Sequence, residues 1–327
     1  MKKIGIVLCI LIGVAGNAAE LSDFAGEQVK KAVPGTITLQ GPDGWLYSRN
    51  ELEHLSRGEL AAGKAAKASV ALKNPDPIPA IQAFNDALKA AGIRLILVPV
   101  PPKFAVYPFG GWKPGDAAKY LKPFYAELRA RGITVVDLTD DFLAARDRNV
   151  YCKTDAHWSP AGILLAARKL KEVIGMEGKT PFRTEDKTLR ISGDLAVSLN
   201  AKAPASESVT VREVKGNAFD ENSPVLLLGD SHILIFSNGA DMLAKDAGLG
   251  EQLACELKMP VDRIGVKGSA SSIVRINLYR KASRNAEWLK NKKVILWILT
   301  CREFTESSNG WMPVPVFKGS GANSGTP

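Results

Sequence analysis

A short apolar run that stops at a glycine, an acid and a serine constrains the fold of this chain more than any other feature. Residues 225–228 read Val-Leu-Leu-Leu and are followed by Gly229, Asp230 and Ser231. Such a run predicts a buried parallel strand, and the glycine lets the chain turn sharply at its end. A serine at that turn lies at the rim of the sheet, where the N–H groups that begin a helix favour negative charge. This is the geometry that a serine nucleophile requires.

A serine needs a base near neutral pH, and the chain has three histidines. His232 directly follows Ser231, and adjacent side chains point apart, so it is a poor base. His54 lies in a polar, helix-like stretch and is expected at the surface. His157 remains, and Asp155 precedes it by two residues, a spacing that lets the carboxylate reach the near ring nitrogen while the far nitrogen accepts a proton. The sequence thus predicts a catalytic triad of Ser231, His157 and Asp155; the alternative is a helix-capping serine and a structural Asp-His loop.

The two blocks together resemble a known family. Gly229-Asp230-Ser231 is similar to the nucleophile block of the SGNH (GDSL-type) esterases and acyltransferases, and Asp155-x-His157-Trp158 is similar to their Asp-x-x-His block in shortened form. The shortened block, placed before the serine, resembles the SGNH-like domain of the alginate O-acetyltransferase family, periplasmic proteins that acetylate exopolysaccharides. The resemblance extends over roughly residues 41–306 and includes three further stretches: Asp-Gly-Trp-Leu-Tyr at 43–47, Pro-Val-Pro-Pro-Lys at 99–103 and Arg-Glu-Phe at 302–304.

Strand-like and helix-like segments alternate along the chain. Parallel β-α-β units with helices on both faces of one sheet follow from this alternation, and the family has the same architecture. We therefore expect a three-layer α/β/α sandwich with a mostly parallel sheet. The expected strands are 93–100, 133–138, 225–228, 261–266 and 294–300, and the expected helices are 79–91, 116–131, 160–173, 240–257 and 271–289.

The ends of the chain differ from its centre in composition. Residues 1–19 combine Lys2 and Lys3, a short apolar run and small residues, a pattern that predicts a secretory signal peptide; an uncleaved anchor is the alternative. The family resemblance implies that the exported protein resides in the periplasm. The predicted organisation is a polar lead-in at 20–40, an SGNH-like domain at 41–306 with an irregular excursion at 175–222, and a flexible C-terminal tail at 307–327.

Export also bears on the cysteines. Without Cys9 three remain, so at most one internal disulfide can form. Cys152 lies just before the Asp-His loop and Cys301 just past the last strand, and loops gather at the carboxyl ends of parallel strands. A Cys152–Cys301 bridge is therefore predicted, with three unpaired buried cysteines as the alternative. No Cys/His spacing suggests a metal site, and no glycine-rich fingerprint suggests a cofactor.

Further site residues are expected around the serine. The Ser231 N–H is the first candidate oxyanion donor. The chain lacks the Gly-x-Asn block of ordinary SGNH esterases, so the remaining donors stay open. Candidates for oxyanion or substrate binding are the loop residues Gly268 and Ser269, the helical Arg275 (or a solvated arginine), Trp158 (or a packing residue) and Arg302 after the last strand.

The resemblance implies a periplasmic polysaccharide O-acetyltransferase that works through an acetyl-serine. It also implies two partners, an exported polysaccharide as acceptor and a membrane-bound O-acyltransferase as acetyl donor. The alternatives are a carbohydrate or lipid O-acetylesterase and a non-catalytic polysaccharide-binding or assembly subunit. The formal charge of +9 suits an anionic polymer or membrane surface, whereas no basic, aromatic-interleaved motif suggests nucleic acid.

Overall fold

A computed structural model describes residues 20–32, 35–60, 63–268 and 270–317. The signal peptide predicted for residues 1–19 and the end of the predicted tail, 318–327, lie outside the described residues. Within these ranges, no helix has the length and apolar character needed to cross a membrane.

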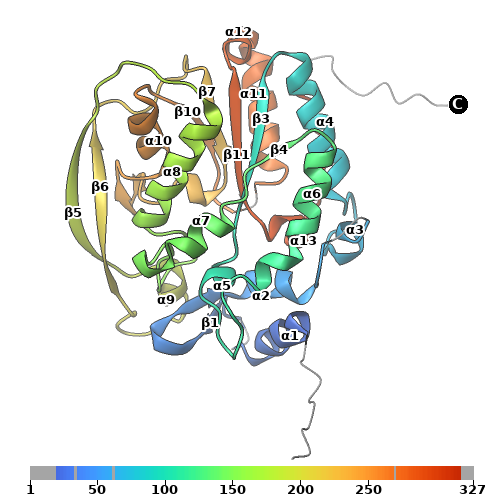
Figure 1. The fold of residues 1–327 in the computed structure, drawn as a ribbon, viewed down its shortest axis with the longest axis vertical. Helices are drawn as coiled ribbons and strands as arrows, with labels where there is room; N and C mark the ends of the chain where they lie inside the picture. Colours follow the sequence, from blue (N-terminus) through green and yellow to red (C-terminus); the bar gives the residue numbers. More distant parts are fainter. Residues whose placement is uncertain (1–19, 33–34, 61–62, 269, 318–327) are drawn as a thin grey trace, which may run out of the picture.

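A five-stranded sheet forms the centre of the molecule (Figure 1). All its neighbouring strands pair in parallel. Every residue of the two central strands is buried, as expected for apolar strands covered on both faces. The strands, in spatial order, are β10 (Asp262–Gly265), β7 (Val225–Gly229), β11 (Val294–Thr300), β3 (Arg94–Val100) and β4 (Thr134–Val135).

Two hydrophobic cores lie on opposite faces of this sheet, because successive residues of each strand point to opposite sides. Leu227 belongs to one core, whereas Leu226 and Leu228 belong to the other. The first core is covered by α8 (Pro160–Ile174) and α10 (Leu249–Leu257), and the second by α4 (Pro77–Ala90), α6 (Lys122–Ala130) and α11 (Ile273–Arg284). The predicted three-layer α/β/α architecture is thus confirmed.

The start of helix α8 is set by local sequence signals, and it lies three residues after His157. Ser159 precedes the helix, and its Oγ accepts a hydrogen bond from the Gly162 N–H at 3.2 Å. Pro160 occupies the first turn, where a missing N–H costs nothing, and Gly175 ends the helix in the left-handed conformation. The cap fixes the end of the segment that carries His157.

The N-terminal part is more ordered than a polar lead-in. Residues 20–40 contain α1 (Leu21–Lys31) and β1 (Thr38–Gln40). Leu21 and Ala25 of α1 are buried in a third hydrophobic cluster, and β1 pairs antiparallel with β2 (Leu46–Ser48). Their burial shows that the predicted lead-in is an integral part of the domain. The described residues of the next segment, 49–73, include α2 (Arg49–Ser56) and α3 (Ala65–Ala68).

The excursion at 175–222 is regular, which corrects the prediction. Its main feature is an antiparallel pair, β5 (Arg183–Ile191) and β6 (Glu207–Lys215), matched over nine residues each. The short helix α9 (Asp194–Ser198) lies between them in the chain. Because most of β5 is exposed on both faces, the strand lacks the apolar alternation that would have revealed it.

Three predicted helices are shorter than expected. Residues 240–245 form no helix: β8 (Asn238–Gly239) and β9 (Met242–Lys245) pair instead, with Ala240 and Leu243 at positive φ. The helix expected at 271–289 breaks at Asn285, whose side chain accepts the Trp288 N–H and starts α12 (Ala286–Lys290). The helix expected at 116–131 begins with a separate 3-10 turn, η2 (Ala117–Tyr120). In each case a local cap or turn ends an apolar pattern that continues along the chain.

Residues 307–317 do not form a flexible tail. Trp311 is 2% exposed, and its ring stacks on that of Phe304 with centroids 5.9 Å apart. The Trp311 indole N–H donates to the Glu303 carbonyl at 3.2 Å, and Val316 is buried as well. The packed domain therefore continues to at least residue 317.

Candidate active site

The turn after β7 places Ser231 at the carboxyl edge of the sheet. A side chain at Gly229 would put its Cβ 2.6 Å from the Ile298 carbonyl oxygen, so only glycine fits beside β11. Asp230 then fixes the turn: its Oδ1 accepts the His232 N–H at 2.8 Å and its Oδ2 accepts the Thr300 N–H at 2.9 Å. The 3-10 turn η4 (Ser231–Ile233) begins at the serine.

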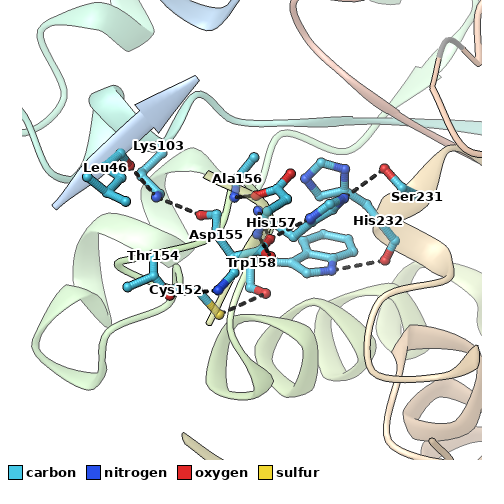
Figure 2. A network of polar contacts seen from close by, with 12 residues as sticks. Leu46, Lys103, Cys152, Thr154, Asp155, Ala156, His157, Trp158, Ser231 and His232 are labelled. Atoms are coloured by element: carbon cyan, nitrogen blue, oxygen red, sulfur yellow. Dashed lines mark hydrogen bonds and ion pairs between the residues drawn. The ribbon is translucent and has the colours of Figure 1, made fainter. Parts of the chain in front are cut away.

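The Asp-His loop brings its imidazole to that serine (Figure 2). The His157 Nε2 lies 2.7 Å from the Ser231 Oγ, and its Nδ1 lies 2.6 Å from the Asp155 Oδ1. The same carboxylate oxygen accepts the His157 N–H at 2.9 Å, which fixes the loop. His157 thus links the other two residues of the predicted triad by hydrogen bonds, although Ser231 lies 74 residues further along the chain.

Charge and burial at these residues fit proton transfer. Burial disfavours a charged His157, but the Asp155 carboxylate outweighs it, so the pKa of His157 is raised above its usual value. Burial also opposes the charge of Asp155, yet His157 and two backbone N–H donors hold the pKa of Asp155 below its usual range. Asp155 stays ionised, and the imidazolium that forms during reaction is stabilised.

Asp194 is a site residue that the sequence did not identify. Its backbone N–H donates to the Asp155 Oδ2 at 2.9 Å, and its Oδ1 accepts the Ala156 N–H at 2.8 Å. A side chain at Gly193 would collide with the Cβ of Asp155, so the glycine permits this close approach. The Gly193-Asp194-Leu195 stretch was visible in the sequence, but it is too short to be specific. Asp155, His157 and Asp194 also have metal-ligand atoms within 4.8 Å of one another, a closeness that these hydrogen bonds account for.

Lys103 is a second residue near the site that the sequence did not identify, and its side chain bonds to the backbone of the Asp-His loop. Its ammonium donates to the carbonyl oxygens of Leu46 and Asp155, both at 2.7 Å, while the side chain is buried (Figure 2). The Glu51 carboxylate accepts the N–H groups of Lys103 and Phe104 at 3.0 and 2.8 Å. Burial lowers the pKa of Lys103 and raises that of Glu51. These contacts give a physical role to the stretches at 43–47 and 99–103.

A pocket of about 220 Å³ opens above the serine. Two of the candidate residues line it, Gly268 and Arg302, together with Ser231, His157 and Asp194. Gly268 has a φ of +92°, a conformation that favours glycine. Ser269 lies outside the described residues. The loop after β10 and the segment after β11 thus both reach the site, as the parallel topology predicts.

Two candidates have structural positions instead. Arg275 is neither placed for oxyanion or substrate binding nor solvated. Its side chain is buried, its Nε donates to the Ser271 carbonyl at 2.7 Å, and its guanidinium lies 5.5 Å from the Trp297 ring centroid. Trp158 is fully buried and donates from its indole nitrogen to the His232 carbonyl at 3.0 Å, so packing is its role.

The expected surface position of His54 is also wrong. The side chain is 2% exposed, and its Nδ1 lies 2.7 Å from the Thr305 Oγ1. Burial and two nearby arginines lower the pKa of His54 to about 3, so the ring is neutral. The hydroxyl that pairs with it comes from a segment 251 residues away, which no local pattern reveals.

The predicted Cys152–Cys301 disulfide does not form. Cys152, Cys255 and Cys301 are free thiols among the described residues. Cys152 packs in the core on one face of the sheet and Cys301 in the core on the other, so the sheet separates them. Burial raises the pKa of both thiols, which keeps them neutral.

The parallel α/β/α sheet with a Ser-His-Asp arrangement at its carboxyl edge defines the SGNH hydrolase-like class. A sequence model of one such family, described as the SGNH hydrolase-like domain of the acetyltransferase AlgX, matches residues 38–299. The chain belongs to this family, which confirms the resemblance seen in its motifs.

The curated relatives that this chain resembles include proteins named probable alginate O-acetylase AlgJ. The protein from Pseudomonas syringae pv. tomato is 32% identical over 156 residues, which is 46% of this chain and 36% of the relative. The protein from Pseudomonas fluorescens is 30% identical over 227 residues, 61% of this chain and 53% of the relative. The matched segments thus span between about one-third and one-half of these relatives.

Two solved structures share the fold. The O-acetyltransferase domain of Pseudomonas putida AlgJ superposes with a TM-score of 0.62 at 23% identity, covering 82% of this chain and 92% of that domain. Pseudomonas aeruginosa AlgX superposes with a TM-score of 0.57 at 19% identity, covering 82% of this chain and 63% of that chain.

Proposed function

We propose that this chain is a polysaccharide O-acetyltransferase that works through an acetyl group carried on Ser231. The observation that carries the proposal is the 2.7 Å contact between the Ser231 Oγ and the His157 Nε2, with Asp155 on the opposite side of the imidazole. Membership of the AlgX domain family and the alginate O-acetylase names of the relatives support the same chemistry.

The first half of the reaction loads the serine. The Ser231 oxygen attacks the acetyl carbonyl of the donor while His157 takes the serine proton. His157 then gives that proton to the leaving group, and the carbon–oxygen bond to the leaving group breaks. The ionised Asp155 holds the Nδ1–H tautomer and stabilises the imidazolium. The raised pKa of His157 suits a group that must both accept and return a proton.

Negative charge on the tetrahedral intermediate needs donors at the pocket. The Ser231 N–H begins the turn η4, where the first N–H groups have no partner within the turn. Gly268 and Arg302 line the same pocket, and we assign them to oxyanion or substrate binding.

The second half transfers the acetyl group. A sugar hydroxyl attacks the acetyl carbon, passes its proton to His157, and the bond to the Ser231 oxygen breaks. The serine oxygen then regains a proton from His157. A water molecule in place of the sugar would make the same site an acetylesterase.

The cellular setting is part of the proposal. The signal-peptide pattern of residues 1–19 supports export to the periplasm. There the acceptor would be an exported polysaccharide, and a membrane-bound O-acyltransferase would supply the acetyl groups. The net charge of +9 suits contact with an anionic polymer.

Replacement of the nucleophile tests the chemistry. Ser231→Ala should abolish p-nitrophenol release from p-nitrophenyl acetate and the acetyl adduct seen on the intact protein by mass spectrometry. Ser208→Ala, an exposed serine on β6, is the matched control and should keep both signals. Activity that survives in Ser231→Ala overturns the proposal.

Oligosaccharide acceptors separate the remaining alternatives. Acetylated sugar formed by the wild type and lost in Ser231→Ala supports transfer. Free acetate as the sole product identifies an esterase. Sugar binding without any acetyl adduct identifies a non-catalytic binding subunit.

A further inference from the structure

A second Asp-His pair stands beside the first, and the proposed reaction does not use it. The His232 Nδ1 lies 3.0 Å from the Asp230 Oδ1. The imidazole of His232 is a direct neighbour of that of His157 (Figure 2), with ring centroids 4.6 Å apart and planes inclined by 52°. Both histidines line the pocket above Ser231.

His232 is held rigidly in this position. Asp230 accepts the His232 backbone N–H with one oxygen and the Thr300 N–H with the other. Trp158 donates its indole N–H to the His232 carbonyl, and its ring meets the His232 ring edge-on at 5.3 Å. The imidazole therefore has a fixed place in the wall of the pocket.

The hydrogen-bond chemistry of the ring follows from its partner. Asp230 is ionised, because His232 and backbone donors lower its pKa despite burial. The His232 Nδ1 must then carry the hydrogen, which leaves Nε2 as an acceptor. Burial lowers the pKa of His232, so the ring stays neutral. The pocket thus has two neighbouring imidazoles whose Nε2 atoms both accept hydrogen bonds.

We propose that His232 positions the acceptor by taking a hydrogen bond from a second hydroxyl, adjacent to the one that attacks, so that the site selects vicinal diols. This inference rests on the proposed transfer reaction. The attacking hydroxyl must donate to His157, which removes its proton, and one hydroxyl has only one hydrogen to donate. A second acceptor atom beside His157 therefore suits a second hydroxyl on the next ring carbon of a sugar.

His232 takes no proton in this scheme. The attacking oxygen forms its bond to the acetyl carbon, the bond to the Ser231 oxygen breaks, and the proton moves through His157 to that oxygen. The neighbouring hydroxyl keeps its hydrogen throughout. His232 is thus a positioning residue, whose effect is on the choice of acceptor rather than on acetylation of the serine.

The test compares acceptors with one and two hydroxyls. Purified full-length protein is loaded with acetyl groups from p-nitrophenyl acetate, and cyclohexanol or a cyclohexane-1,2-diol (cis or trans) is added. The ratio of acetyl ester to free acetate measures the choice between acceptor and water. After correction for the number of hydroxyls, the wild type should favour at least one of the diols by about tenfold, as expected for one added hydrogen bond.

His232→Asn is the informative variant, because its amide can still donate to Asp230 but lacks the Nε2 acceptor. The diol preference should disappear, and transfer to the diols should fall at least about tenfold more than p-nitrophenol release and transfer to cyclohexanol do. His232→Gln, whose longer side chain places an amide oxygen nearer the Nε2 position, should restore part of the preference. His54→Asn is the matched control: His54 is equally buried but bonds to Thr305 outside the pocket, and this variant should keep the wild-type ratio.

Three results would overturn the inference. One is a wild type without diol preference, and another is an unchanged preference in His232→Asn. The third is an equal loss of transfer to cyclohexanol and to the diols in His232→Asn. That result would mean that His232 only packs against His157 and does not bind the acceptor. Failure of the proposed function is distinguishable, because the wild type would then form no acetyl ester with any acceptor.

Discussion

The two Asp-His pairs at the rim of the sheet have the same local design but opposite electrostatics. In each pair the acid precedes the histidine by two residues and faces its Nδ1, at 2.6 Å for Asp155 and His157 and at 3.0 Å for Asp230 and His232. Yet the pKa of His157 is raised, whereas that of His232 is lowered.

More distant charges explain the difference. Burial disfavours the cation in both rings, but His157 also feels the carboxylates of Asp194 and Asp230. His232 has one carboxylate partner and feels the positive charges of His157 and Arg302. A carboxylate partner alone therefore does not make a base; the summed field at the ring decides which histidine exchanges protons and which one stays neutral.

The strongest test of this contrast replaces each acid by its amide. Asp155→Asn should lower kcat/KM for p-nitrophenyl acetate by about a thousandfold or more, because the amide favours the wrong tautomer of His157. Asp230→Asn should lower it by about tenfold, since Ser231 keeps its base. Losses of equal size would show that the two pairs act as one unit.

Lys103, which bonds to the loop of Asp155 and His157, should also contribute to stability. Lys103→Met removes the ammonium and leaves the buried carbonyl oxygens of Leu46 and Asp155 without these hydrogen bonds, so the free energy of unfolding should fall by about 3 kcal/mol. Urea unfolding measures the loss, and Lys113→Met, at an exposed lysine, serves as control. If Lys103→Met is as stable and as active as the wild type, Lys103 does not hold the Asp-His loop in place.

Close packing at Gly193 supports the first pair. Gly193→Ala should force Asp155 out of position, at a cost of about 1–3 kcal/mol in stability. Gly216→Ala is the control, because its added carbon would have no atom closer than 3.7 Å, although its φ of +115° also strains an alanine. Activity should fall more in Gly193→Ala than in this control. Thermal unfolding and p-nitrophenyl acetate kinetics measure both effects; an unchanged kcat/KM in Gly193→Ala contradicts the positioning role.

The smallest expected effect is a shift in pH dependence. Activity requires neutral His157, so it should rise with pH through the raised pKa of that ring. Asp194→Asn removes a negative charge that favours the imidazolium, so the pKa of His157 falls and the acid limb of the kcat/KM profile moves to lower pH. The amide oxygen can still accept the Ala156 N–H, so the fold should persist. A shift to higher pH would contradict the assigned cause.

The sequence predicted what local chemistry determines. The central strands follow from apolar runs such as 225–228, and the triad follows from a turn after a strand together with the scarcity of histidines. Partners far apart in the chain could not be predicted. Lys103 is buried because carbonyl groups from two other segments receive its hydrogen bonds, and backbone carbonyls leave no mark in a sequence. His54 depends on a threonine near the other end of the domain, and the two cysteines are kept apart by the thickness of the sheet.

The packing of Trp311 has a practical consequence for recombinant work. A fragment that ends at residue 306, where the family-like motifs end, would lack Trp311, whose ring stacks on Phe304. It would therefore expose part of the second hydrophobic core. Such a fragment would expose aromatic surface to solvent and tend to aggregate during expression. A fragment that extends beyond residue 317 keeps Trp311 packed against Phe304.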